Sequence, residues 1–235
     1  MNLLLLETAT PRCSVALSND AVPVAELHSD QPNAHSSQLH LLIRQILTEN
    51  ALTPSDLDAV CVSSGPGSYT GLRIGTSTAK GLAYALDIPL LAVPTPQSMA
   101  ARYIHLHPDF DGLLCPMLDA RRMECYTAFY RPSSDESPVF EERAVSADVI
   151  EPHCYDSYLD NSQVVFFGDG AEKTRPILST HPNARFDPSF SISAEGLAPL
   201  AWYRLRQHYV EDVAYFEPFY LKDFVAKKSV VRGLR

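Results

Sequence analysis

A glycine-rich turn between an apolar run and a helical pattern restricts the fold of this chain more than any other feature. The turn covers residues 63–75 and reads S-S-G-P-G-S-Y-T-G-L-R-I-G. The apolar residues 57–62 before it predict a buried strand, and the spacing in residues 70–86 predicts a helix. Backbone in such a turn comes close to a phosphate, another helix or another chain.

The glycine spacing fits neither common phosphate-binding motif. A P-loop requires G-x-x-x-x-G-K-[ST], but Gly67 and Gly71 are too close together and Arg73 is not at the lysine position. The dinucleotide motif G-x-G-x-x-G also fails, because Gly65, Gly67 and Gly71 read G-x-G-x-x-x-G. Binding of an anion by the backbone amides at the start of the helix remains an alternative.

Small residues recur at every fourth position along the turn and the helix: Gly67, Gly71, Gly75, Ala79 and Ala83. Such a column lies along one helix face. Because a glycine inside a helix costs roughly 1 kcal/mol relative to alanine, the column predicts an unusually close contact. Two alternatives remain at this point, namely packing on the chain's own sheet and a surface for a partner.

A second amphipathic helix is predicted over residues 35–50. Its apolar residues follow the i, i+3, i+4, i+7 spacing of one helix face and are Leu39, Leu42, Ile43 and Ile46. Leu41 and Leu47 widen this apolar surface beyond one stripe, which suggests contacts on two sides.

Composition places the chain among ordinary globular proteins. It has 235 residues, of which 46% are hydrophobic and 20% charged, enough for two small lobes or one large domain. The net charge of −9 argues against nucleic-acid binding by the body of the protein. Residues 222–235 are basic by contrast, and we expect residues 226–235 to form a flexible tail.

The cysteines indicate a reducing compartment. Cys13, Cys61, Cys115, Cys125 and Cys154 form no C-x-x-C pair and predict free thiols in the cytoplasm. The apolar run at residues 3–6 lacks the basic residues of a signal peptide. No run approaches the roughly 20 apolar residues of a membrane span, so no membrane association is expected.

The remaining pattern predicts an α/β protein in two parts. Strands are expected at residues 3–6, 13–17, 22–27 and 90–93, then at 113–118, 124–130 and 164–167. The first three make an antiparallel meander with a turn at 18–20, and the pair around D-A-R-R-M makes a hairpin. A helix is expected over residues 194–209, with Pro199 in its first turns.

Four segments resemble the TsaB (YeaZ) family, bacterial proteins for making threonylcarbamoyladenosine in tRNA. They are L-L-L-L-E-T-A-T-P-R-C-S-V-A-L, the turn at 63–75, M-L-D-A-R-R-M-E-C-Y-T-A-F-Y and E-P-F-Y-L, and the resemblance covers residues 3–221. It implies a two-lobed actin-like or sugar-kinase-like (ribonuclease H-like) fold, each lobe a mixed sheet with helices. The lobes would be residues 1–105 and 106–225, with the helix at 194–209 packing back on the first lobe.

The resemblance also implies a function. A TsaB protein is a non-catalytic scaffold or activator that pairs with TsaD and works with the ATPase TsaE. The complex forms N6-threonylcarbamoyladenosine in tRNAs reading ANN codons, and tRNA is contacted mainly through the complex. Formation of a homodimer remains an alternative when TsaD is absent. The family's partner surface maps to helices 35–50 and 70–86, and its expected residues are His35, Leu39, Leu42, Ile43, Ile46, Gly71, Leu72, Arg73, Gly75, Thr76 and Ala79.

A relic nucleotide cleft is the other implied site. Glu7 ends the first strand where the family more often has Asp, and Thr8 follows it. Asp119 ends the corresponding strand of the second lobe, and Gly168 and Gly170 resemble adenosine-loop glycines. No tightly bound cofactor is expected on this chain. Binding of ATP or ADP remains an alternative for the assembled complex.

Histidine spacing argues against a metal site and catalytic residues. TsaD-like enzymes hold a metal with H-x-x-x-H on one helix face, but His35 and His40 point about 140° apart on a helix. His105 and His107 are two apart on an expected loop, so all eight histidines are interpreted as surface residues. The alternatives are an ATP-binding kinase or transferase of the same fold and a glycoprotease-like metallopeptidase. The missing metal-ligand spacing argues against the metallopeptidase, and the absence of a G-x-S-x-G elbow argues against a serine nucleophile.

Overall fold

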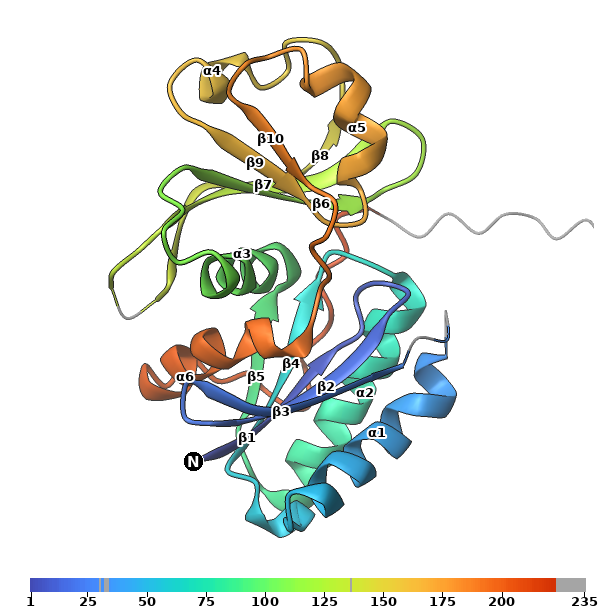
Figure 1. Ribbon diagram of the computed structural model, residues 1–235. Helices are drawn as coiled ribbons and strands as arrows, with labels where there is room; N and C mark the ends of the chain where they lie inside the picture. The colour runs from blue at the N-terminus through green and yellow to red at the C-terminus, as the bar shows by residue number, and fades with distance from the viewer. Residues whose placement is uncertain (30, 32–33, 136, 223–235) are drawn as a thin grey trace, which may run out of the picture.

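Two five-stranded mixed sheets form the framework of the computed structural model (Figure 1). The structure describes residues 1–29, 31, 34–135 and 137–222. The basic tail predicted at residues 226–235 lies outside these described residues. In the part of the chain that is described, no helix is both long and apolar enough to cross a membrane. The cysteines are free thiols, as predicted, and only Cys154 is exposed.

The first lobe has the sheet order β3-β2-β1-β4-β5. Its strands are β1 (Asn2–Glu7), β2 (Cys13–Asn19), β3 (Val22–Ser29), β4 (Ala59–Gly65) and β5 (Leu90–Pro94). The predicted antiparallel meander is confirmed, and β4 and β5 add in parallel. The leucines of β1 are fully buried because helices cover both faces of the sheet, which explains the unbroken apolar run. A short 3-10 helix, η1 (Pro54–Asp56), delays β4 beyond its predicted start at residue 57.

The second lobe repeats this topology, with the order β10-β9-β6-β7-β8. Its strands are β6 (Leu113–Asp119), β7 (Glu124–Pro132), β8 (Val139–Val149), β9 (Val164–Phe167) and β10 (Ala184–Asp187). In each sheet the first strand of the lobe is central, a hairpin partner and an edge strand lie on one side, and two parallel strands lie on the other. The predicted two-lobed actin-like fold, with a mixed sheet and helices in each lobe, is confirmed.

Helices cover both faces of both sheets (Figure 1). The outer helices are α1 (His35–Glu49) and α2 (Tyr69–Leu86) on the first sheet and α4 (Asp156–Leu159) and α5 (Ala171–Leu178) on the second. Between the sheets lies α3 (Thr95–Leu106), whose Met99, Ala100 and Tyr103 pack on the second sheet and Ala101 on the first.

The helix predicted at 194–209 is two elements. A 3-10 turn, η2 (Ala194–Leu197), precedes α6 (Ala198–Arg206). Pro199 lies at the start of α6, where a missing N–H leaves no helical hydrogen bond unmade. Ala194, Leu197 and Leu200 bury themselves against Leu3 and Leu5 of the first sheet.

The chain then returns along the first lobe in a segment that we call the strap, residues 211–222. It pairs with β5 through Leu90 and Glu211 and packs Val213 and Phe216 on the α1–α2 side of the sheet. Lys80 of α2 donates to the carbonyls of Ala214 and Phe216, 3.2 and 2.9 Å away. The strap therefore ends at the carboxyl end of β4, beside the second lobe.

Candidate functional site

A cleft of about 890 Å³ lies between the two lobes. The first lobe contributes residues 9–11 after β1 and residues 66–70 at the start of α2. The second lobe contributes residues 118–122 after β6, and the strap contributes residues 219–222. The carboxyl ends of parallel strands open here, which is where α/β sheets place their ligands.

Glu7, predicted to face this cleft, is instead fully buried. Its Oε1 accepts hydrogen bonds from the Ala9 N–H at 2.7 Å and the Ser63 hydroxyl at 2.8 Å, while Oε2 has no partner among the described residues. Burial raises the pKa of this carboxyl from 4.5 to about 7, although both hydrogen bonds lower it. The carboxylate that ends β1 is therefore not presented to the cleft.

The small-residue column of α2 explains this burial. A Cβ on Gly67 would overlap Ala9, and a Cβ on Gly71 or Gly75 would overlap Thr8. The column therefore lets α2 cover the loop after β1, which seals Glu7 and Thr8 inside, both 0% exposed. Of the two alternatives for the column, packing within the chain is the one that the structure contains.

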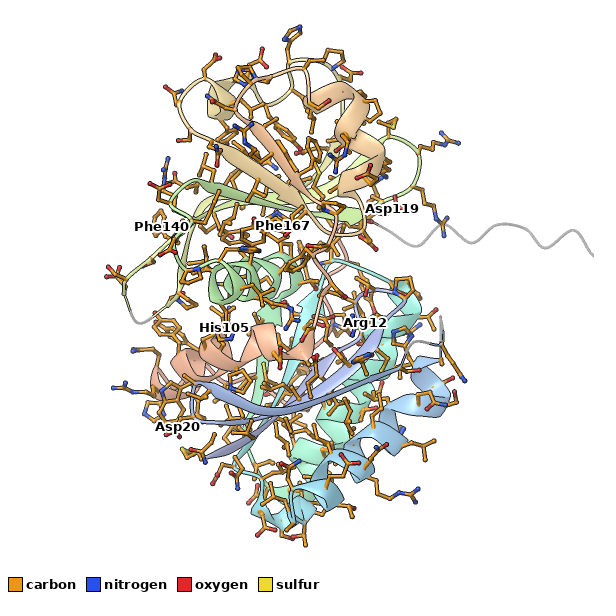
Figure 2. The ribbon with its side chains drawn as sticks, viewed as in Figure 1. Arg12, Asp20, His105, Asp119, Phe140 and Phe167 are labelled. Atoms are coloured by element: carbon orange, nitrogen blue, oxygen red, sulfur yellow. The ribbon has the colours of Figure 1, made fainter. Side chains whose placement is uncertain are left out.

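Asp119, the predicted counterpart in the second lobe, does line the cleft. Figure 2 shows it at the end of β6, where the second lobe faces the first. It forms an ion pair with Lys173 and accepts from the Arg121 N–H at 2.9 Å. Burial raises the pKa of Asp119, but the Lys173 and Arg121 contacts outweigh it and hold the pKa below its usual value.

Gly168 and Gly170 pack inside the second lobe and do not belong to the described lining of the cleft. Gly168 has a φ of +106°, and a Cβ there would lie 2.5 Å from the carbonyl oxygen of Met117. Gly170 sits against Cys125 and the end of β6. Their predicted role as adenosine-loop glycines is thus not visible in the cleft geometry, because both serve strand packing.

Two features of the cleft mouth escaped sequence reasoning. The hairpin turn after β6 holds Arg121 and Arg122 in left-handed backbone conformations, with φ of 71° and 50°, which residues other than glycine seldom adopt. On the other side of the cleft, Tyr220 of the strap contacts Tyr69 at the start of α2 in a tilted arrangement, with ring centres 4.9 Å apart. The D-A-R-R-M hairpin and the E-P-F-Y-L ending were visible signals, but nothing in the sequence placed them together.

The partner residues predicted on α1 and α2 need correction. Arg73 is exposed, but the others are buried in this chain's own core: His35, Leu39, Leu42, Ile43, Ile46, Gly71, Leu72, Gly75, Thr76 and Ala79. The broad apolar stripe of each helix faces the sheet, so these side chains pack mainly in this chain's own core, although Ile43 also lines a surface groove. His35 is not a surface histidine either, since its Nε2 lies 2.9 Å from the carbonyl oxygen of Thr10.

A groove between the outer faces of α1 and α2 is available instead, with a volume of about 470 Å³. Its lining mixes apolar and polar side chains of both helices and the loop after α1: His40, Ile43, Arg44, Leu47, Thr48, Leu52, Thr53, Pro54, Ser77, Thr78, Gly81 and Leu82. Gly81 has nothing within 4 Å of the place where a Cβ would be. Packing within the chain therefore gives no reason for a glycine in the middle of α2.

Candidate metal ligands are dispersed. In residues 1–29, 31, 34–135 and 137–222, no three His, Cys, Asp or Glu side chains come together in a group that could hold an ion. His107 lies 3.5 Å from Asp187 and His153 2.8 Å from Asp156, each as an isolated pair at the surface.

Known proteins resemble this chain along most of its length. A family model described as TsaD, tRNA N6-adenosine threonylcarbamoyltransferase, matches residues 29–231. The tRNA threonylcarbamoyladenosine biosynthesis protein TsaB of Escherichia coli is 29% identical, with 98% of both chains covered. The protein of that name in Bacillus subtilis is 35% identical over 64% of this chain, but the match spans only 65% of that relative, less than two thirds.

A solved structure resembles it in three dimensions as well. YeaZ from Pseudomonas aeruginosa superimposes with a TM-score of 0.78 at 25% identity, covering 94% of this chain and 99% of that one. Sequence and structure agree on the same group of relatives. The chain therefore belongs to the family that the TsaD model describes, and within it to the TsaB (YeaZ) group.

Proposed function

We propose that this chain is a non-catalytic subunit of the bacterial machinery that forms N6-threonylcarbamoyladenosine in tRNA. The names of its relatives in Escherichia coli and Bacillus subtilis point to this pathway. The observation that carries the non-catalytic role is the burial of Glu7, whose carboxyl bonds to its own chain. A carboxylate sealed under α2 cannot reach a substrate in the cleft, so the reacting groups belong to another subunit.

That subunit is TsaD, and the groove between α1 and α2 is its docking surface. The exposed Gly81 lets a partner helix approach α2 closely, and the neighbouring Leu82 and Ile43 give the groove an apolar floor. TsaE and ATP act at the level of the assembled complex, and tRNA is modified there. When TsaD is absent, a second copy of the chain occupies the same groove.

The test of the non-catalytic role is tRNA modification by the reconstituted complex carrying Glu7→Gln or Asp119→Asn. A true catalytic carboxylate contributes on the order of 10²–10⁴ in rate. We expect rates within about threefold of wild type, a small fraction of that range. A hundredfold loss with unchanged TsaD affinity and melting temperature would show that the chain supplies a reacting group.

The test of the docking surface is Gly81→Arg, with Gly81→Ala as its matched control. An arginine at this position would project into the groove, and nothing lies within 4 Å of its Cβ position, so the variant should fold and lose TsaD in a titration. The alanine adds only a methyl group and should keep TsaD binding. Tight binding by folded Gly81→Arg would place the partner elsewhere on the molecule.

A further inference from the structure

Exposed aromatic rings gather at the mouth of the cleft. Tyr220 and Phe219 of the strap are 36% and 47% exposed, although both are large and partly apolar. Tyr69 adjoins Tyr220 with an interplanar angle of 39°. The guanidinium carbon of Arg73 lies 5.2 Å from the centre of the Tyr69 ring, and its Nη1 donates to the Tyr69 hydroxyl at 3.0 Å. These contacts hold the Tyr69 and Tyr220 rings in place, while Tyr220 stays partly exposed.

Exposed arginines lie on the same cleft. Asp119 is paired with Lys173, and Glu124 with Lys222. Asp169 accepts from the Asp119 N–H at 2.9 Å. Arg121 and Arg122 are exposed, and no carboxylate of the described residues forms an ion pair with either guanidinium. The chain as a whole has a net charge of −9, so two adjacent exposed arginines on one cleft wall differ from the acidic character of the rest of the protein.

Aromatic faces beside free guanidinium groups match the chemistry of single-stranded nucleic acid. Unpaired bases stack on tyrosine and phenylalanine rings, and arginine binds the phosphates between them. An acidic peptide would use the arginines but not the rings. The cleft, at about 890 Å³, has room for more than one nucleotide unit. Its lining shares no residue with the α1–α2 groove, so both surfaces can be occupied together.

We propose that the cleft mouth binds a single-stranded segment of RNA, with bases on Tyr220 and Phe219 and phosphates on Arg121 and Arg122. The identification of the nucleic acid as RNA rests on the proposed function. The site would let this subunit hold an unpaired loop of the RNA while the chemistry proceeds on its partner.

The experiment uses the full chain and a fluorescently labelled RNA stem-loop, with a blunt duplex of the same stem and ATP as further probes. We expect Tyr220→Ala to weaken stem-loop binding by about five- to a hundredfold, the range for losing one stacked base. Arg121→Ala with Arg122→Ala should lower the slope of log K against log salt by about 1.4. All variants keep residues 223–235, so any contribution of that segment cancels.

Matched controls lie outside both the cleft and the α1–α2 groove. Tyr84, 82% exposed towards the other end of α2, controls for loss of a tyrosine, and the exposed Arg185 of β10 controls for loss of an arginine. The proposal is overturned if Tyr84→Ala and Arg185→Ala have the same effects or if the duplex binds as tightly as the stem-loop. It is also overturned if ATP displaces the stem-loop with equal or higher affinity, which would mark a site for free nucleotide.

Co-purification with TsaD separates this proposal from the proposed function. If Tyr220→Ala and wild type both retain TsaD but bind RNA equally, only the RNA site is wrong. If wild type binds the stem-loop through Tyr220 but never associates with TsaD, the RNA site stands and the proposed function fails.

Discussion

Glu7 and Asp119 occupy the same place in the two lobes but lie in opposite environments. Each ends the central strand of its sheet, β1 or β6. Glu7 is fully buried and burial raises its pKa to about 7, whereas the Asp119 side chain is 48% exposed and its pKa is lowered by Lys173 despite some burial. A repeated topology thus repeats the position of a carboxylate without repeating its chemistry. The following loop decides whether that carboxylate meets solvent.

Backbone geometry is the part that both lobes do share. Gly65 ends β4 and Gly168 directly follows β9, which are the fourth strands of the two lobes. Both glycines have a φ of +106°, a conformation that other residues seldom adopt. A Cβ on Gly65 would lie 2.5 Å from the carbonyl oxygen of Phe219, and one on Gly168 would lie 2.5 Å from that of Met117. The two lobes therefore keep the same glycine conformation at the end of the fourth strand while their side chains differ.

Gly75→Arg should disrupt the packing of α2 on the loop after β1. The new side chain would be forced against Thr8 in the core, combining overpacking with an unpaired buried charge. We expect a loss of about 5 kcal/mol or more, enough to unfold an ordinary domain, visible as a lost cooperative transition in urea. Gly81→Arg is the control on the same helix and should stay folded. A folded Gly75→Arg would mean that α2 does not close over Glu7.

The buried carboxyl makes a pH-dependent prediction for Glu7→Gln. Since the folded pKa of about 7 exceeds the unfolded value of 4.5, wild-type stability is full below about pH 4.5 and falls as the pH rises through 7. The shift corresponds to about 3 kcal/mol. Urea unfolding should therefore show the variant more stable by up to that amount at pH 8.5 and equal at pH 4. Parallel stability curves for the two proteins would show that Glu7 is solvated.

Sequence reasoning located the strands where burial is continuous. The apolar runs predict nearly the observed bounds of β1 and β9, because both faces of these internal strands are covered. The edge strand β8 was missed because most of its residues are exposed or half-buried and it has no apolar run. No helix was predicted for α3 because two prolines, Pro94 and Pro96, stand where it begins. Pro96 is nevertheless compatible with a helix, since it lies in the first helical turn.

The candidate site was less accessible to sequence reasoning. Asp119 could be placed on the cleft because the family resemblance implies a carboxylate at the end of this predicted strand. The burial of Glu7 could not be predicted, since it depends on a contact between α2 and the loop after β1. The contact between the Tyr220 and Tyr69 rings could not be predicted either, because the two residues are about 150 positions apart in sequence. The spacing of small residues showed a close contact but not its direction.

Gly170→Ala sharpens the comparison at the level of packing. A Cβ on Gly170 would lie 3.0 Å from the Cys125 sulfur and from a backbone carbon of Leu118, a tight contact that small shifts relieve. We expect a loss of about 1 kcal/mol in urea unfolding. Gly71→Ala, whose Cβ would overlap the Thr8 carbonyl, should lose distinctly more. Equal losses would mean that the second lobe is packed as rigidly around its strand end as the first.

Asp119→Asn gives the smallest expected effect and has the opposite sign to Glu7→Gln. The folded pKa of Asp119 lies below its usual 3.8, so its contribution to stability is present above that value and is lost only as the pH falls through the folded pKa. Because the ion pair with Lys173 is half-exposed and screened by water, we expect about 0.5 kcal/mol at pH 7, shrinking further in high salt. Urea unfolding in low and high salt measures this loss. A gain in stability at pH 7, as expected for Glu7→Gln, would mean that the charged Asp119 carboxylate also destabilises the folded protein. The two strand ends would then be electrostatically alike. A small, salt-sensitive loss would leave the second lobe as the side of the cleft that keeps a charged carboxylate in contact with solvent.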